Sequence, residues 1–150
     1  MRVVIQRVKK ASLSVNNEVI SSVNEGFMIL VGIEYADSQD DIDFLVKKIT
    51  NLRVFDDENG VMNKSINEIN GEILCVSQFT LHASTKKGNR PSYIKAAKPE
   101  ISLPLYDKLC EDLSFALENQ IKKGIFGAHM QIELINDGPV TIIIDSKIKE

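Results

Sequence analysis

Hydrophobic and polar residues alternate along the beginning of the chain, which predicts β-structure. The alternation runs from Val3 to Val15 and is rich in β-branched residues, as is typical of a half-buried strand. Asn16-Asn17 is a turn signal, so we expect Glu18–Val23 to return as a second strand. Phe27–Ile33 is apolar apart from Gly32, which predicts a third strand covered on both faces.

Two later segments repeat their apolar residues with the period of a helix. Ser38 can cap the first helix, and the carboxylate of Asp41 lies near its positive end. Its apolar stripe is Ile42, Leu45, Val46 and Ile49. The second pattern follows Pro99 and continues to Ile121, and we expect that helix to end at Gly124.

The remaining apolar segments predict strands. Glu72–Leu81 is predicted to be a buried strand, and Met130–Leu134 a strand with one solvent-exposed face. Val140–Ile144 is the last predicted strand, and Asn136–Pro139 is a predicted turn before it. We therefore predict one α+β domain over residues 1–150, with two main helices and a mixed, mostly antiparallel sheet in barrel-like layers.

Composition narrows the possible functions. The chain is 43% hydrophobic and 26% charged, as in soluble globular proteins, and its net charge of −3 excludes a global affinity for polyanions. Residues 86–98 are a local exception with five basic residues and no acid. They are Lys86, Lys87, Arg90, Lys95 and Lys98. This segment predicts a phosphate-binding loop, with an ordinary solvated loop as the alternative.

The sequence gives no indication of a metal, a cofactor or a membrane partner. Cys75 and Cys110 lie in apolar stretches, which predicts two buried, reduced thiols, and two thiols alone cannot complete a structural zinc site. The first residues lack the apolar region of a signal peptide, and no apolar run approaches the roughly 20 residues of a membrane span. We expect a cytoplasmic protein.

Two polar segments are not needed for a core. Ser77-Gln78-Phe79-Thr80-Leu81 ends an apolar strand with polar side chains, and alternation would place Gln78 and Thr80 on the face opposite Ser77. In Asn136–Thr141, Pro139 has no backbone N–H to donate to a neighbouring strand, so the carbonyl of Gly138 is free to face something other than a strand. Taken singly, a fraying strand and a plain turn explain both segments.

Together, Ser77–Leu81 and Asn136–Thr141 resemble the paired signatures of the D-aminoacyl-tRNA deacylase family. The resemblance continues in order and spacing along almost the whole chain. The matching segments are Arg2–Val8, Leu52–Phe55, Met62-Asn63, Gly88–Ser92 and Gly124–Gly127. It implies hydrolysis of the ester between a D-amino acid, or glycine, and the 3′-terminal adenosine of tRNA.

The resemblance also implies a homodimer with active sites at the subunit interface. Ser77–Leu81 would form the pocket of one subunit, and a cis Gly138-Pro139 of the other would reach into it. The main-chain carbonyls of Gly138 and Pro139 would collide with an L side chain and accommodate a D-residue. Arg7 would hold those carbonyls through its fixed fork of donors, with a surface arginine as the alternative.

The resemblance assigns the pocket residues. Ser77, Gln78, Phe79 and Thr80 would serve the chemistry, while Phe126, Met130, Lys86, Lys87 and Arg90 would bind substrate. Phe79 either stacks on the terminal adenine or belongs to the core.

The catalytic mechanism rests on which group activates the nucleophile. Thr80 is a poor nucleophile unless a base is within reach. Alternation would place His82 on the same strand face as Thr80, as a candidate base, but His82 is not part of the family motif and we expect it in the mouth of a loop. His129 is interpreted as structural. We favour attack by water, with Thr80, Ser77 and backbone N–H groups near Phe79 orienting the ester. A non-catalytic RNA-binding module and a small D-amino-acid ester hydrolase are the alternatives.

Overall fold

The computed structural model describes residues 1–149, in which one long strand organises the sheet. Strand β1 (Arg2–Val15) pairs antiparallel with β2 (Glu18–Val23), β3 (Gly26–Gly32) and β8 (Gln131–Asp145). On the far side of β3, β6 (Glu72–Ser77) and then β7 (Lys122–Lys123) continue the sheet in parallel. A separate ribbon joins β4 (Phe55–Asp56) to β5 (Met62–Lys64). The predicted α+β class and mixed sheet are confirmed.

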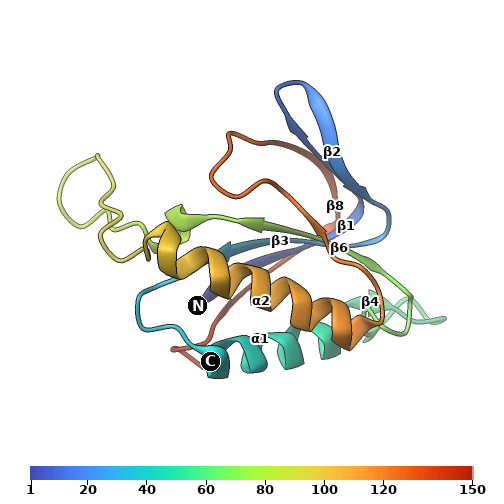
Figure 1. The fold of residues 1–150 in the computed structure, drawn as a ribbon. Helices are drawn as coiled ribbons and strands as arrows, with labels where there is room; N and C mark the ends of the chain where they lie inside the picture. Colours follow the sequence, from blue (N-terminus) through green and yellow to red (C-terminus); the bar gives the residue numbers. More distant parts are fainter. Residues whose placement is uncertain (150) are drawn as a thin grey trace.

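Both helices, α1 (Gln39–Asn51) and α2 (Pro99–Leu117), cover the same face of the sheet (Figure 1). The main core lies between them and the sheet, and it includes Phe27, Ile29, Leu45, Ile49, Ile73, Leu109 and Leu113. Alternate residues of β3 and β6 point the other way and form a second cluster, which includes Val8, Leu13, Met28, Leu74 and Val76. The two clusters explain why β3 is apolar at successive positions.

The start of α1 agrees with the sequence, whereas the end of α2 does not. The backbone N–H of Ser38 donates to the carboxylate of Asp41 at 2.8 Å, and α1 begins one residue after Ser38. The predicted continuation of α2 to Gly124 is wrong. Glu118 adopts a left-handed conformation (φ 50°), and the N–H of Asn119 donates back to Ser114, so the helix ends at Leu117. Ile121 is buried as predicted, but it follows the helix and is not part of it.

The predicted turn at Asn136–Pro139 is also wrong, because β8 runs through it without reversing. Gln6 pairs with Thr141 and Val8 with Asn136, so one residue of β1 faces four of β8. The extra residues form a bulge that contains the Gly138-Pro139 bond, which is cis. No helix among residues 1–149 has the length and apolarity to cross a bilayer.

Candidate active site

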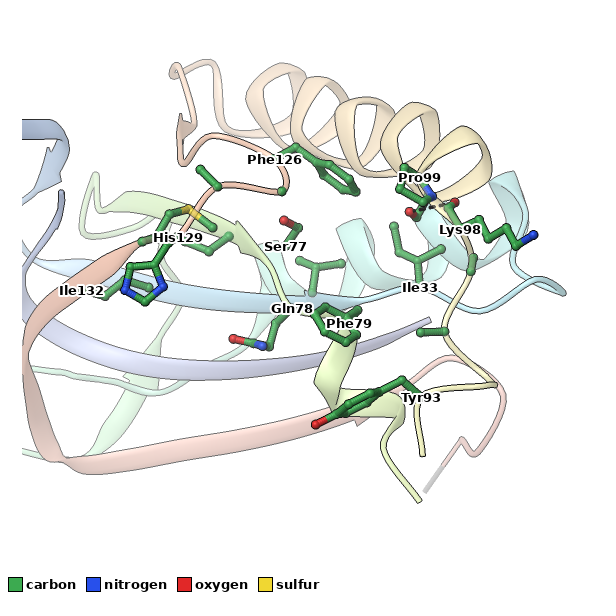
Figure 2. Close-up of a pocket in the computed structure, with 18 residues that line it drawn as sticks. Ile33, Ser77, Gln78, Phe79, Tyr93, Lys98, Pro99, Phe126, His129 and Ile132 are labelled. Carbon is green, nitrogen blue, oxygen red and sulfur yellow. Dashed lines mark hydrogen bonds between the residues drawn. The ribbon is translucent and has the colours of Figure 1, made fainter. Parts of the chain in front are cut away.

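A cavity of about 600 Å³ opens beside the end of β6, under the beginning of α2. Among its lining residues are five that the sequence analysis selected for the site: Ser77, Gln78, Phe79, Phe126 and Met130. Figure 2 shows Lys98 and Pro99, from the start of α2, at one end of the cavity, with His129 and Ile132 at the other. Segments far apart in the sequence thus converge on the polar end of one central strand.

The polar end of β6 is a turn and not the strand that Glu72–Leu81 predicted. The last residue pair with β3 is Val31–Ser77, and the N–H of Gln78 still donates to the carbonyl of Val31 at 2.7 Å. Because β3 ends at Gly32, the next residues have no strand to pair with and form the 3-10 helix η1 (Phe79–His82). The alternating faces expected beyond Ser77 are therefore wrong.

Thr80 lies on this 3-10 turn, half-buried and outside the set of residues that line the cavity. Its Oγ1 accepts a hydrogen bond from Nε2 of Gln78 at 2.6 Å, which leaves its own proton free to donate. The expected position of His82 in a loop mouth is wrong. His82 is buried, and its Nδ1 lies 2.8 Å from Oε1 of Glu34, so it is engaged away from Thr80.

Phe79 does not belong to the core, since 55% of it is exposed at the cavity. Tyr93 packs edge-on against it, with ring centroids 5.0 Å apart and planes inclined by 74°. Sequence reasoning missed Tyr93 as a site residue, although an aromatic inside a basic segment was an available signal. It also missed His129, which is exposed and lines the cavity.

The basic segment leaves the cavity as a projecting loop (Figure 1, yellow-green). Backbone hydrogen bonds between Ser84 and Ser92, of 2.8 and 2.9 Å, close its base. Lys86, Lys87 and Arg90 are exposed beyond that base. The loop returns through Tyr93, and Lys98 at its end lines the cavity, so positive charge extends from the loop to the cavity rim.

The bulge of β8 does not line the cavity of its own chain. Gly138 (φ 121°) and Pro139 are exposed, whereas Arg7 lies buried behind them. The surface alternative for Arg7 is therefore wrong. Its guanidinium donates to the carbonyls of Asp137 (3.1 Å) and Val54 (2.6 Å) and not to the Gly138 and Pro139 carbonyls that were expected.

The two thiols lie on β6 and α2 and do not line the cavity. Cys75 and Cys110 are buried and free, as predicted. The adjacent Cys110 thiol and burial raise the pKa of Cys75, which therefore stays protonated. Within residues 1–149, no three His, Cys, Asp or Glu side chains gather closely enough to hold a metal ion.

Comparison with known proteins identifies the family. The family model described as D-Tyr-tRNA(Tyr) deacylase matches residues 4–145. The "D-aminoacyl-tRNA deacylase" of Bacteroides fragilis (strain YCH46) is 68% identical over 150 residues, and that of Bacteroides thetaiotaomicron is 66% identical, in each case over the full length of both chains.

Solved structures agree with this fold. The structure titled "c-Myc DNA Unwinding Element Binding Protein" is 44% identical, covers 97% of this chain and 98% of its own, and superposes with a TM-score of 0.91. A second, titled "Structural Analysis of a probable eukaryotic D-amino acid tRNA deacylase", is 19% identical over 95% of this chain and 97% of its own, with a TM-score of 0.80, and supports the fold alone. The chain belongs to the D-aminoacyl-tRNA deacylase family, a family of hydrolases that act on an ester bond.

Proposed function

We propose that this protein hydrolyses the ester of D-aminoacyl-tRNA, and of glycyl-tRNA, to the free amino acid and tRNA. The observation that carries the proposal is the convergence of Ser77, Gln78 and Phe79 on a cavity whose rim continues into a basic loop. A cavity of this size suits an aminoacylated nucleoside, and the loop suits the phosphates beyond it.

Water is the attacking group in this reaction. Its oxygen adds to the ester carbonyl carbon, and the tetrahedral oxyanion collapses by breaking the bond to the ribose 3′ oxygen, which leaves with a proton. The first N–H groups of a helical turn lack internal acceptors, so those of Phe79 and Thr80 at the start of η1 are available to the oxyanion. An aminoacyl ester is already activated, and the vicinal 2′-hydroxyl can assist, so no strong base is required.

Thr80 orients the ester and does not become acylated. A hydroxyl nucleophile needs a base in hydrogen-bond reach. The partner that Thr80 has within residues 1–149 is the amide of Gln78, which donates to it and accepts no proton from it. The proton of Thr80 is therefore free to donate to a substrate group.

A second subunit selects the D-enantiomer. Gly138 and Pro139 lie outside their own cavity on a bulge, while Arg7 holds the backbone behind them. The outer edge of β8 has no strand partner among residues 1–149, and Ile135 and Ile143 are exposed along it. We infer a homodimer in which this edge is covered and the Gly138-Pro139 carbonyls of each protomer enter its partner's cavity, where an L side chain would collide with them.

The substrate's nucleic-acid end binds outside the cavity. Lys86, Lys87 and Arg90 contact phosphates of the acceptor end without reading sequence. Phe79, with Tyr93 against its edge, offers a face for the terminal adenine, a stacking contact typically worth about 1–3 kcal/mol.

The experiment that tests the function compares D- and L-tyrosyl-tRNA as substrates of the purified protein. Hydrolysis confined to the D-enantiomer is expected, and equal rates would refute the steric mechanism. Binding without cleavage would support an RNA-binding module, and equally fast cleavage of simple D-amino-acid esters would support a small-ester hydrolase. A sedimentation run at micromolar concentration accompanies the assay, because an active monomer would contradict the shared site.

Binding of DNA is a second candidate function. The solved relative of 44% identity carries the name of a protein that binds a DNA unwinding element, and the exposed basic loop of this chain offers sequence-independent phosphate contacts. A single-stranded DNA oligonucleotide that competes with tRNA for the loop, at comparable affinity and equal salt, would support this function.

A further inference from the structure

One buried histidine near the cavity has no place in the reaction described above. His82 is the last residue of η1, and its side chain is 1% exposed. Its Nδ1 lies 2.8 Å from Oε1 of Glu34, within hydrogen-bond distance, whereas its Nε2 is buried without a hydrogen-bond partner among residues 1–149. A buried polar atom without a partner is destabilising, so we look for a role of this ring in its contacts with the surrounding turn and strand.

Glu34 is the point at which the two ends of the basic loop meet. Its backbone forms an isolated antiparallel bridge with Ala96, and beside it the N–H of Ala97 donates to the carbonyl of Ile33 at 2.9 Å. The loop departs immediately after His82 and returns at Ala96. The His82–Glu34 hydrogen bond therefore joins the start of the loop to its end, below the pair of Ser84–Ser92 hydrogen bonds.

The imidazole ring also sets the distance between η1 and the end of β3. Gly32, the last residue of β3, has no side chain, and a Cβ there would come within 3.0 Å of His82 Cδ2 and Nε2 and within 2.9 Å of Leu81 Cβ. On the other side, Arg2 donates to the carbonyl of Leu81 at 2.8 Å. The turn that presents the backbone of Phe79 and Thr80 is thus held between an arginine and a buried ring.

We propose that His82 is a positioning residue for the deacylation reaction, acting through its hydrogen bond to Glu34. This inference rests on the proposed function. The bond holds η1, and with it the N–H groups of Phe79 and Thr80, in register with the loop that binds the acceptor end. Displacement of a reacting group by about 1 Å can cost up to about 10²-fold in rate. The base of the projecting loop is closed separately by Ser84 and Ser92, so ground-state binding of tRNA does not depend on His82.

Two substitutions of similar size separate this role from simple packing. In H82N the amide nitrogen takes the place of Nδ1 and keeps the hydrogen bond to Glu34, whereas in H82Q the amide lies at the place of Nε2 and loses it. We expect kcat for D-tyrosyl-tRNA to stay within about threefold of wild type in H82N and to fall about tenfold in H82Q, with KM changed less than about twofold in both. E34A should match H82Q, and adding it to H82Q should cost little more.

The control is I49V, a buried substitution in α1 that lowers the melting temperature and should leave kcat unchanged. Equal kcat values for H82N and H82Q, or a loss carried by KM, would overturn the proposal. A second readout needs no substrate. The chain has only two histidines, and the ¹⁵N spectrum of their rings should show His82 protonated at Nδ1 and not at Nε2, in a pattern that E34A abolishes. If wild type fails to cleave D-tyrosyl-tRNA, the proposed function fails, and this spectrum still decides whether the hydrogen bond forms.

Discussion

The end of β6 and the bulge of β8 are the two segments that resemble the family signatures, and they interact with their own chain in opposite ways. Ser77–Phe79 turns inward and lines a cavity of its own protomer. Gly138-Pro139 leaves a strand edge, is exposed, and contributes nothing to that cavity. In the proposed reaction, the first segment supplies side chains and backbone donors for the chemistry, whereas the second supplies backbone carbonyls that select the substrate.

Different groups support the two segments. Behind the end of β6 lie the hydrogen bond from Gln78 to Val31, the buried ring of His82 beside Glu34, and the guanidinium of Arg2 on the carbonyl of Leu81. Behind the bulge lies a charged group, the guanidinium of Arg7, which contacts both the carbonyl and the carboxylate of Asp137. We therefore expect damage to the first segment to lower the rate, and damage to the second to lower the selectivity.

Substitution at Thr80 should produce the largest effect. T80A removes the hydroxyl whose proton is free to donate, and kcat for D-tyrosyl-tRNA should fall about 10²-fold, as when one preorganised donor is lost, while T80S retains most activity. Selectivity against the L-enantiomer should not change. Single-turnover deacylation measures both values. A covalent acyl-enzyme trapped on Thr80 of the wild type would contradict attack by water.

Substitution at Arg7 should have the converse effect. R7M leaves the carbonyls of Asp137 and Val54 without their donor, so the free energy of unfolding should fall by about 1–3 kcal/mol and the bulge should lose its fixed position. We expect the ratio of D- to L-tyrosyl-tRNA hydrolysis to fall about tenfold, with D-activity reduced less.

Lys9 provides the control for Arg7. It lies 3.6 Å from the same Asp137 carboxylate but is 56% exposed, so K9M should change neither stability nor selectivity appreciably. If R7M unfolds at the wild-type denaturant concentration and rejects L-tyrosyl-tRNA as before, Arg7 does not support the bulge.

Much of the architecture follows from the sequence because its signals are local. The alternation of β1, the capping pair Ser38–Asp41 and the helical stripe of α1 each depend on a few neighbouring residues. The turn at η1 was missed because its cause is distant in sequence: β6 loses its partner where β3 ends. The bulge was missed for the same reason, because it is defined by how β8 pairs with β1, a strand far away in the sequence.

The candidate site shows the same difference between local sequence signals and features that depend on distant segments. Ser77, Gln78 and Phe79, which the motif selected, line the cavity, and their roles in the chemistry stay predictions. Tyr93 and His129 were not found, because only the packing of separate segments brings them to its rim. His82 was expected in the mouth of a loop because it lies outside the motif, whereas the 3-10 turn buries its ring beside Glu34.

Substitutions in the basic loop should have a smaller effect, which involves neither the end of β6 nor the bulge of β8. K86A combined with K87A should raise KM for aminoacyl-tRNA about fivefold and reduce the slope of log KM against log salt by about 1–2, with kcat and selectivity unchanged. The matched control is K47A with K48A, two exposed lysines of α1 that change net charge equally. Equal effects from both pairs would show that overall charge, and not this loop, attracts the tRNA.

The smallest effect concerns acid and tests whether the end of β8 and the end of β6 have separate supports. Burial would raise the pKa of Asp41, but hydrogen bonds from Lys147 and Ser146, just beyond β8, and from the Ser38 backbone outweigh it and hold that pKa well below its ordinary value of 3.8. A carboxyl with a depressed folded-state pKa contributes stability that is complete above its unfolded pKa and is lost as pH falls below it.

Hydrogen exchange at pH 5 and pH 3 measures this effect. Opening near Asp145 and Ser146 should become easier by about 1 kcal/mol at the lower pH, after correction for intrinsic exchange rates, before the amides of β6 respond. D41N should already be loosened at pH 5 and should change less between the two conditions. If both strand ends loosen together in wild type, the two segments share one support, and the division between rate and selectivity loses its structural basis.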